Sequence, residues 1–195
     1  MSEQLEKGKF EQLVQRINPG NKLLRTWELK GGISAQVTAM EVMSPHGKAV
    51  KMIVRQHGTA DLRRNPHIAA DEFKLLQMLK ILGLPVPSPY FFDETCKILS
   101  SPYIVIGFVE GETELNPDNV TDYIAQLASN LAKVHLVDGK QLDFSFLPIQ
   151  EDVFREMLEN SSADKDDSLH KGFIKRVLKS VWPLPSRNKH TLLHG

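Results

Sequence analysis

Hydrophobic and polar positions change their pattern near the middle of the chain. Before about residue 110, apolar residues occur mostly in short runs separated by turn-forming residues, a pattern typical of β-strands. The cluster Ser44-Pro45-His46-Gly47 separates two of these runs and predicts a hairpin turn. The expected strands cover residues 23–30, 35–43, 49–56, 90–92 and 103–108.

One segment of this first half has a helical pattern instead. Between residues 68 and 82, apolar side chains such as Phe73, Leu76 and Leu79 recur at three- and four-residue spacing, which predicts an amphipathic helix. Gly83 is expected to end the helix, and the three prolines between residues 84 and 89 predict an extended connector. The first half therefore predicts a small antiparallel sheet packed by one helix.

Beyond Gly111 the pattern becomes helical. Tyr123, Leu127 and Leu131 line one face of a predicted helix, and two further helices are expected over residues 151–159 and 169–182. The chain is thus expected to be an α+β protein. Its boundary falls near residues 109–116, between a β-rich part at 1–110 and an α-rich part at 111–195.

Composition narrows the class of protein. Of the 195 residues 41% are hydrophobic, which is enough for a globular core, and 24 basic side chains balance 24 acidic ones. A neutral chain has no long-range attraction for nucleic acid or for an anionic membrane, so neither partner is expected. The single Cys96 excludes an internal disulfide, the charged N-terminus does not resemble a signal peptide, and no apolar run is long enough to span a membrane. We expect a cytoplasmic protein.

Two motifs in the β-rich half could hold an anion. Gly31-Gly32 lies between two predicted strands, where glycines let the backbone approach a phosphate, and Ser34 adds a hydroxyl and an amide. A diglycine between strands is also simply a hairpin turn. Arg55 is on the third strand and Glu72 on the following helix. A buried arginine needs an acidic partner, and Glu72 is placed to be that partner. The alternative is that both side chains are solvated charges on the protein surface. Lys51 shares the face of Arg55 and is the weaker candidate.

Three histidines bear on the functional interpretation, two near the C-terminus and one at the end of a predicted helix. His190 and His194 are four residues apart, but no third ligand is evident and the residues between them are typical of a strand, so we do not expect a metal site. His135, at the end of its predicted helix, is interpreted as structural.

The order of these motifs resembles the aminoglycoside phosphotransferase and choline kinase-like family, and the resemblance covers nearly all of the chain. It implies a protein-kinase-like fold, with residues 1–110 as a nucleotide-binding small lobe and residues 111–195 as a linker and incomplete helical lobe. It also implies ATP and Mg²⁺ as cofactors of the complete protein. The residues that it assigns to ATP binding are Gly31, Gly32, Ser34, Arg55, Glu72, Phe108, Val109 and Glu110.

Each assignment has a role that the resemblance supplies. The diglycine turn and Ser34 would cover the phosphates, and Arg55, oriented by Glu72, would contact the α- and β-phosphates. The segment Phe108-Val109-Glu110-Gly111 would be the hinge that presents backbone groups to adenine. The alternative interpretation of Phe108 and Val109 is that they are core residues.

The final residues, Leu192-Leu193-His194-Gly195, resemble the start of the family's catalytic loop, in which an aspartate comes next. We therefore expect the ATP-binding portion of a kinase for a hydroxyl of an aminoglycoside, amino alcohol or sugar-like compound, inactive as this chain. The alternatives are a non-catalytic nucleotide-sensing or interaction module and an unrelated α+β binding domain. The helices after residue 116 are expected to have uncovered apolar faces, through which the chain could form a homo-oligomer.

Overall fold

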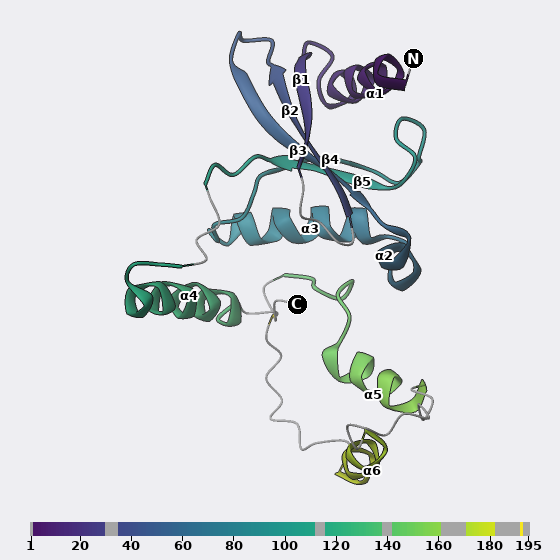
Figure 1. Cartoon of the computed structure of the whole chain (residues 1–195), viewed down its shortest axis with the longest axis vertical. Coiled ribbons are helices and arrows are strands. Elements are labelled where there is room, and N and C mark those ends of the chain that lie inside the picture. Colours follow the sequence, from purple (N-terminus) through teal and green to yellow (C-terminus); the bar gives the residue numbers. More distant parts are fainter. Residues whose placement is uncertain are drawn as a thin grey trace. The chain divides into compact units, whose positions relative to one another are not determined.

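The computed structural model describes residues 2–29, 35–111, 116–137, 142–160, 171–181 and 192. Its backbone contacts divide the chain into two compact units, residues 1–130 and 131–195, and each is described by itself. The first unit contains five strands and the helices around them (Figure 1). In chain order its elements are α1 (Ser2–Ile17), β1 (Lys22–Leu29), β2 (Ala35–Met43), β3 (Ala49–His57), α2 (Thr59–Arg64), α3 (Ile68–Ile81), β4 (Pro89–Asp93), β5 (Tyr103–Gly107) and most of α4 (Val120–His135).

The five strands form one antiparallel sheet in the order β1-β2-β3-β5-β4. The predicted hairpin joins β2 to β3: the Gly47 amide donates a 3.0 Å hydrogen bond to the Ser44 carbonyl, and Gly47 has a φ of +76°. A side chain rarely adopts that backbone conformation, which is why glycine stands in the turn. The antiparallel sheet and all five predicted strands are confirmed, with ends that differ by at most one residue.

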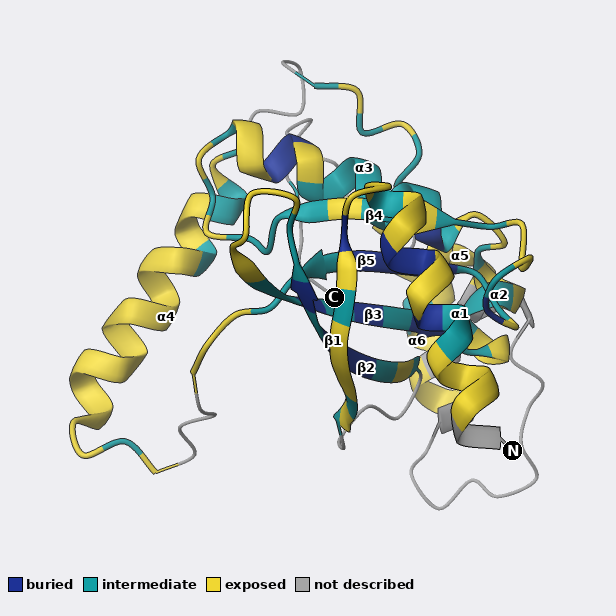
Figure 2. Cartoon of the chain, turned by 90° about the horizontal axis from the view of Figure 1, so that it is seen from above, coloured by how far each residue is buried: buried dark blue, intermediate teal, exposed yellow. Residues whose placement is uncertain are grey.

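One face of the sheet forms the hydrophobic core with α1. Met40, Val42, Met52 and Val54 alternate along β2 and β3 and pack with apolar side chains of the helix. The helix contributes Phe10, Leu13 and Val14. The prediction of a single packed helix was therefore wrong, because α1 covers this face and α3 lies on the other (Figures 1 and 2).

The predicted helix α3 packs against β4 and β5 on the second face. The rings of Phe73 and Phe92 lie with their centroids 5.1 Å apart. The helix ends at Ile81, and Gly83 follows with a φ of +76°; its amide donates to the Lys80 carbonyl at 3.0 Å. Gly83 thus ends the helix as expected, through a left-handed cap.

The second unit holds the end of α4 with α5 (Gln150–Asn160) and α6 (Lys171–Val181). As expected, large apolar side chains are exposed on α4, which is drawn largely in the exposed colour in Figure 2. Exposed apolar side chains on α4 and α6 include Tyr123, Ile124, Leu127, Phe173, Ile174, Val177 and Val181. Among the described residues, no helix has the length and apolar character that crossing a membrane requires.

Candidate functional site

Arg55 and Glu72 meet on the face of the sheet that α3 covers. The Arg55 Nη1 atom donates a 2.7 Å hydrogen bond to Glu72 Oε1, although the residues lie on different elements. Their side chains keep 36% and 21% of their exposure, so the pair is partly open to solvent. The predicted contact between a strand cation and a helix acid is present, and neither residue is an isolated solvated charge.

Burial and charge act in opposite directions on Glu72. Desolvation raises the pKa of this carboxyl, whereas the charge and the hydrogen bond of Arg55 lower it. The negative charge of Asp61 raises the pKa of Glu72 again. Glu72 therefore depends on Arg55 to remain ionised in a partly buried position.

The predicted hinge begins where β5 ends. The Gly107 amide donates to the Ser88 carbonyl at 2.8 Å, and the Phe108 amide donates to the Lys51 carbonyl at 3.2 Å. Within the described part of the chain, Val109 and Glu110 form no backbone-to-backbone hydrogen bond, and the side chain of Val109 is exposed. The alternative interpretation of Val109 as a core residue was therefore wrong. The backbone N–H and C=O groups of Val109 and Glu110 are available to a ligand.

Two aromatic rings with charged side chains at both ends lie beside the hinge. Trp27 and Phe108 have their ring centroids 6.2 Å apart, with Arg25 5.0 Å from the Trp27 centroid and Lys51 5.4 Å from that of Phe108. Lys51 also forms a 2.6 Å ion pair with Glu110. We call Trp27, Lys51, Phe108 and Glu110 the hinge stack. It includes the weaker candidate Lys51, and Trp27 is a residue that the sequence pattern had not indicated.

Apolar residues lie between the hinge stack and Arg55. Ala39, Ile53 and Ile106 are aligned across three neighbouring strands, and Ile53 is midway between Lys51 and Arg55. Side chains two apart on a strand share a face, so these residues have Arg55 and Lys51 on their own side of the sheet. Arg55 comes four positions after Lys51 on β3, so their Cα atoms are about 13 Å apart at a rise of roughly 3.3 Å per residue.

This face carries three chemically distinct kinds of group, each suited to a different part of a ligand. Arg55 can bind an anionic group, the apolar side chains can contact a flat ring, and the hinge backbone can form hydrogen bonds with the edge of that ring. Gly31, Gly32 and Ser34, predicted to cover the anion, lie outside the described residues, as do His190 and the His194-Gly195 pair. In the part of the chain that is described, no cluster of three His, Cys, Asp or Glu side chains could hold a metal ion.

His57 is the polar residue of this region that sequence reasoning missed. Its side chain is fully buried, and Nε2 lies 3.3 Å from Glu72 Oε2. The only available signal was its position two residues after Arg55, which places both side chains on the same face of β3.

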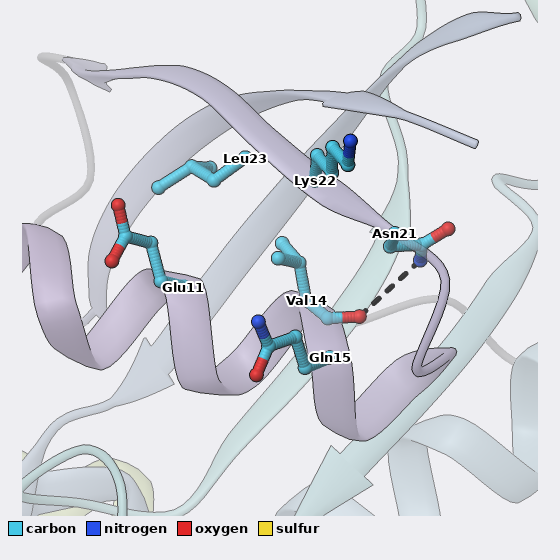
Figure 3. A pocket seen from close by; sticks show the side chains of 6 residues that line it. All are labelled: Glu11, Val14, Gln15, Asn21, Lys22 and Leu23. Carbon is cyan, nitrogen blue, oxygen red and sulfur yellow. Dashed lines mark hydrogen bonds between the residues drawn. The ribbon is translucent and has the colours of Figure 1, made fainter. Parts of the chain in front are cut away.

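A separate pocket of about 190 Å³ lies between α1 and the start of β1 (Figure 3). Glu11, Val14, Gln15, Asn21, Lys22 and Leu23 line it. The Asn21 side-chain amide donates to the Val14 carbonyl at 3.3 Å, which ties the turn after α1 to that helix. None of the predicted site residues lines this pocket.

Comparison with known proteins identifies the family and the fold. The model of the family described as phosphotransferase enzyme family matches residues 28–195. A crystal structure of a "putative aminoglycoside phosphotransferase" from Ralstonia eutropha JMP134 has a similar fold, with a TM-score of 0.55 and 16% sequence identity. The match covers 84% of this chain and 51% of that one, so this chain spans about half the length of the solved protein. The comparison with curated proteins gave no match.

Proposed function

Because the chain belongs to the phosphotransferase enzyme family, we propose that its sheet and hinge bind ATP as part of a kinase for a small-molecule hydroxyl group. The observation that carries this proposal is the Arg55–Glu72 pair, on the same face of the sheet as the hinge. The similar solved fold supports a kinase-like arrangement of these elements. Gly31, Gly32 and Ser34 complete the proposed ATP site over the phosphates.

Each described residue of the proposed site has a definite task. Arg55 binds the phosphates through its planar, permanently charged fork, and Glu72 fixes the direction of that fork. The backbone of Val109 and Glu110 binds the edge of adenine, and Ala39, Ile53 and Ile106 contact its face. Mg²⁺ bound with the nucleotide supplies neutralisation of the phosphate charge.

The acceptor that we propose is a hydroxyl of an aminoglycoside, amino alcohol or sugar-like compound. The description of the similar structure as an aminoglycoside phosphotransferase supports this class, and the family supports phosphate transfer in general.

Isothermal titration with ATP and Mg²⁺ tests the proposal. We expect saturable binding by the 195-residue protein and at least a tenfold loss of affinity, about 1.4 kcal/mol, in Arg55→Ala. Arg25→Ala is the matched control, since Arg25 is a 64% exposed arginine of the same sheet whose partner is Glu41. Absence of binding by the unaltered protein, or equal losses in both variants, would contradict the ATP site.

A further inference from the structure

A buried imidazole lies directly beside the Arg55–Glu72 pair. The side chain of His57 has no solvent exposure, and its Nε2 atom is 3.3 Å from Glu72 Oε2. Arg55 contacts the other carboxylate oxygen, Oε1, at 2.7 Å. Glu72 therefore has one oxygen directed to each neighbour, and both neighbours come from β3.

The two nitrogens of this ring are at present unsatisfied. Neither Nδ1 nor Nε2 has a hydrogen-bond partner among the described residues, so the 3.3 Å approach is a close contact that is not aligned as a hydrogen bond. A buried polar group without a partner costs roughly 1–3 kcal/mol. A small rotation of the ring would remove that cost by aligning Nε2–H with the carboxylate.

The charged groups around the ring favour its neutral form. Arg55 on β3, Asp61 on α2 and Glu72 on α3 face His57. Burial lowers the pKa of His57 and the positive charge of Arg55 lowers it further, while Asp61 acts in the opposite direction. A neutral imidazole has one N–H to donate, and Glu72 is the acceptor that lies within reach.

We propose that His57 is a positioning residue of the ATP site, which holds Glu72 Oε2 through its Nε2–H and so keeps Oε1 directed at Arg55. This inference rests on the proposed function, because it assigns His57 to the arginine that binds phosphate. A glutamate held at both oxygens cannot rotate about its last bond, whereas a single contact leaves that rotation free. Loss of the Nε2–H group therefore loosens Arg55 without touching the nucleotide.

Three substitutions at position 57 separate this role from simple packing. His57→Gln keeps a donor at the place of Nε2, His57→Asn keeps one only at the place of Nδ1, and His57→Leu removes both. We expect ATP affinity to stay within about threefold of the unaltered protein in the glutamine variant and to fall about tenfold, or 1.4 kcal/mol, in the other two. His67→Leu is the control, since the side chain of His67 is 75% exposed.

The stability of the position-57 variants distinguishes a positioning role of His57 from a packing role. The ring nitrogens of His57 have no hydrogen-bond partner among the described residues, so His57→Leu removes an unsatisfied buried polar group and should keep its unfolding midpoint in urea while losing ATP affinity. A packing role would lower stability in all three variants and would not distinguish glutamine from asparagine. Should the leucine variant fail to fold, the comparison of glutamine with asparagine still decides.

A measurement without nucleotide separates failure of this inference from failure of the ATP site. The Arg55 Nε–H signal in ¹⁵N NMR, identified by its absence in Arg55→Lys, should be sharp in the unaltered protein and in His57→Gln. In His57→Asn and His57→Leu it should broaden or move toward the position of a free arginine. An unchanged signal in the leucine variant overturns the positioning role, whereas absence of ATP binding by the unaltered protein overturns only the proposed function.

Discussion

Lys51 and Glu110 are 59 residues apart in the sequence, yet the Lys51 Nζ atom lies 2.6 Å from Glu110 Oε1. The contact joins β3 to the segment that follows β5, beside the ring of Phe108. Both partners are open to solvent, with 37% and 71% of their side chains exposed. An exposed pair of this kind orients a segment more than it stabilises the fold.

A double-mutant cycle on this ion pair should therefore give a small coupling energy. For Lys51→Ala, Glu110→Ala and the double variant we expect a coupling of about 0.2–1 kcal/mol in urea unfolding at low salt, decreasing as salt screens the charges. The Arg25–Glu41 pair, at 2.7 Å, is the comparison within the same sheet. A coupling that exceeds 2 kcal/mol and does not respond to salt would show that the pair is desolvated.

The lowered pKa of His57 predicts an acid-dependent loss of stability. The unfolded chain takes up this proton near the ordinary value of 6.5, whereas the folded protein does so only at lower pH. Between those values the unfolded state binds more protons, so the free energy of unfolding falls as the pH falls, by at most about 1.4 kcal/mol per pH unit. Urea titrations from pH 7.5 to 5 should show this slope, and His57→Gln should remove it; an identical slope in both proteins would exclude His57 as its source.

The raised pKa of Glu72 predicts a slope of the opposite sign. The unfolded chain releases this proton near 4.5, and the folded protein retains it to a higher pH because burial disfavours the carboxylate. From pH 4.5 upward to the folded pKa, the free energy of unfolding should therefore decrease as the pH rises. Glu72→Gln should abolish this decrease in the same urea titrations. A decrease that persists in the glutamine variant would assign it to another carboxyl.

The core position of Leu13 predicts that α1 is integral to the first unit. Leu13 has no exposure and packs with the apolar residues of β2 and β3, so Leu13→Ala should lower the free energy of unfolding by about 2–5 kcal/mol. Leu5→Ala, at a 67% exposed position of the same helix, should change it by no more than about 0.5 kcal/mol. Equal effects at the two positions in urea unfolding would mean that the helix does not pack on the sheet.

The contact between Trp27 and Phe108 predicts an optical signal for nucleotide binding. In a Trp182→Phe background Trp27 is the remaining tryptophan, and its ring is 6.2 Å from that of Phe108. Adenine bound at the hinge should change the emission of Trp27 in a saturable way, and Phe108→Leu should reduce the change. A parallel titration with adenosine, which has no phosphate, separates the effect of base contacts on the emission from that of phosphate contacts. An emission that stays constant across an ATP titration followed in parallel by calorimetry would place the base away from the hinge stack.

Local patterns were sufficient to predict the strands and α3, whereas the Arg55–Glu72 contact was expected from the family resemblance. Alternation and turn residues identify strands directly, and the requirement that a partly buried cation has an acid nearby links residues that are 17 positions apart. The same reasoning did not find α1. Its first turns are charged and exposed, and its core residues Phe10, Leu13 and Val14 lie only in its second half.

Contacts that depend on strand order could not be predicted in the same way. β5 inserts between β3 and β4, and this order brings Phe108 and Glu110 to Lys51. Pairing of β1 with β2 then places Trp27 on the same side, in register with Ala39. A one-residue change in any of these registers would turn the side chain to the other face, so the hinge stack follows only from the complete sheet.

The strand that bears Lys51, Arg55 and His57 is the middle one of the five, with β2 along one edge and β5 along the other. Fraying begins at the margins of a sheet, so its backbone amides should exchange with solvent only when the entire sheet opens. Substitutions that loosen β1 or β4 can therefore change how often the edge strands open while the Arg55 guanidinium keeps its position. The positions of the three β3 side chains are thus protected from sequence changes in the edge strands.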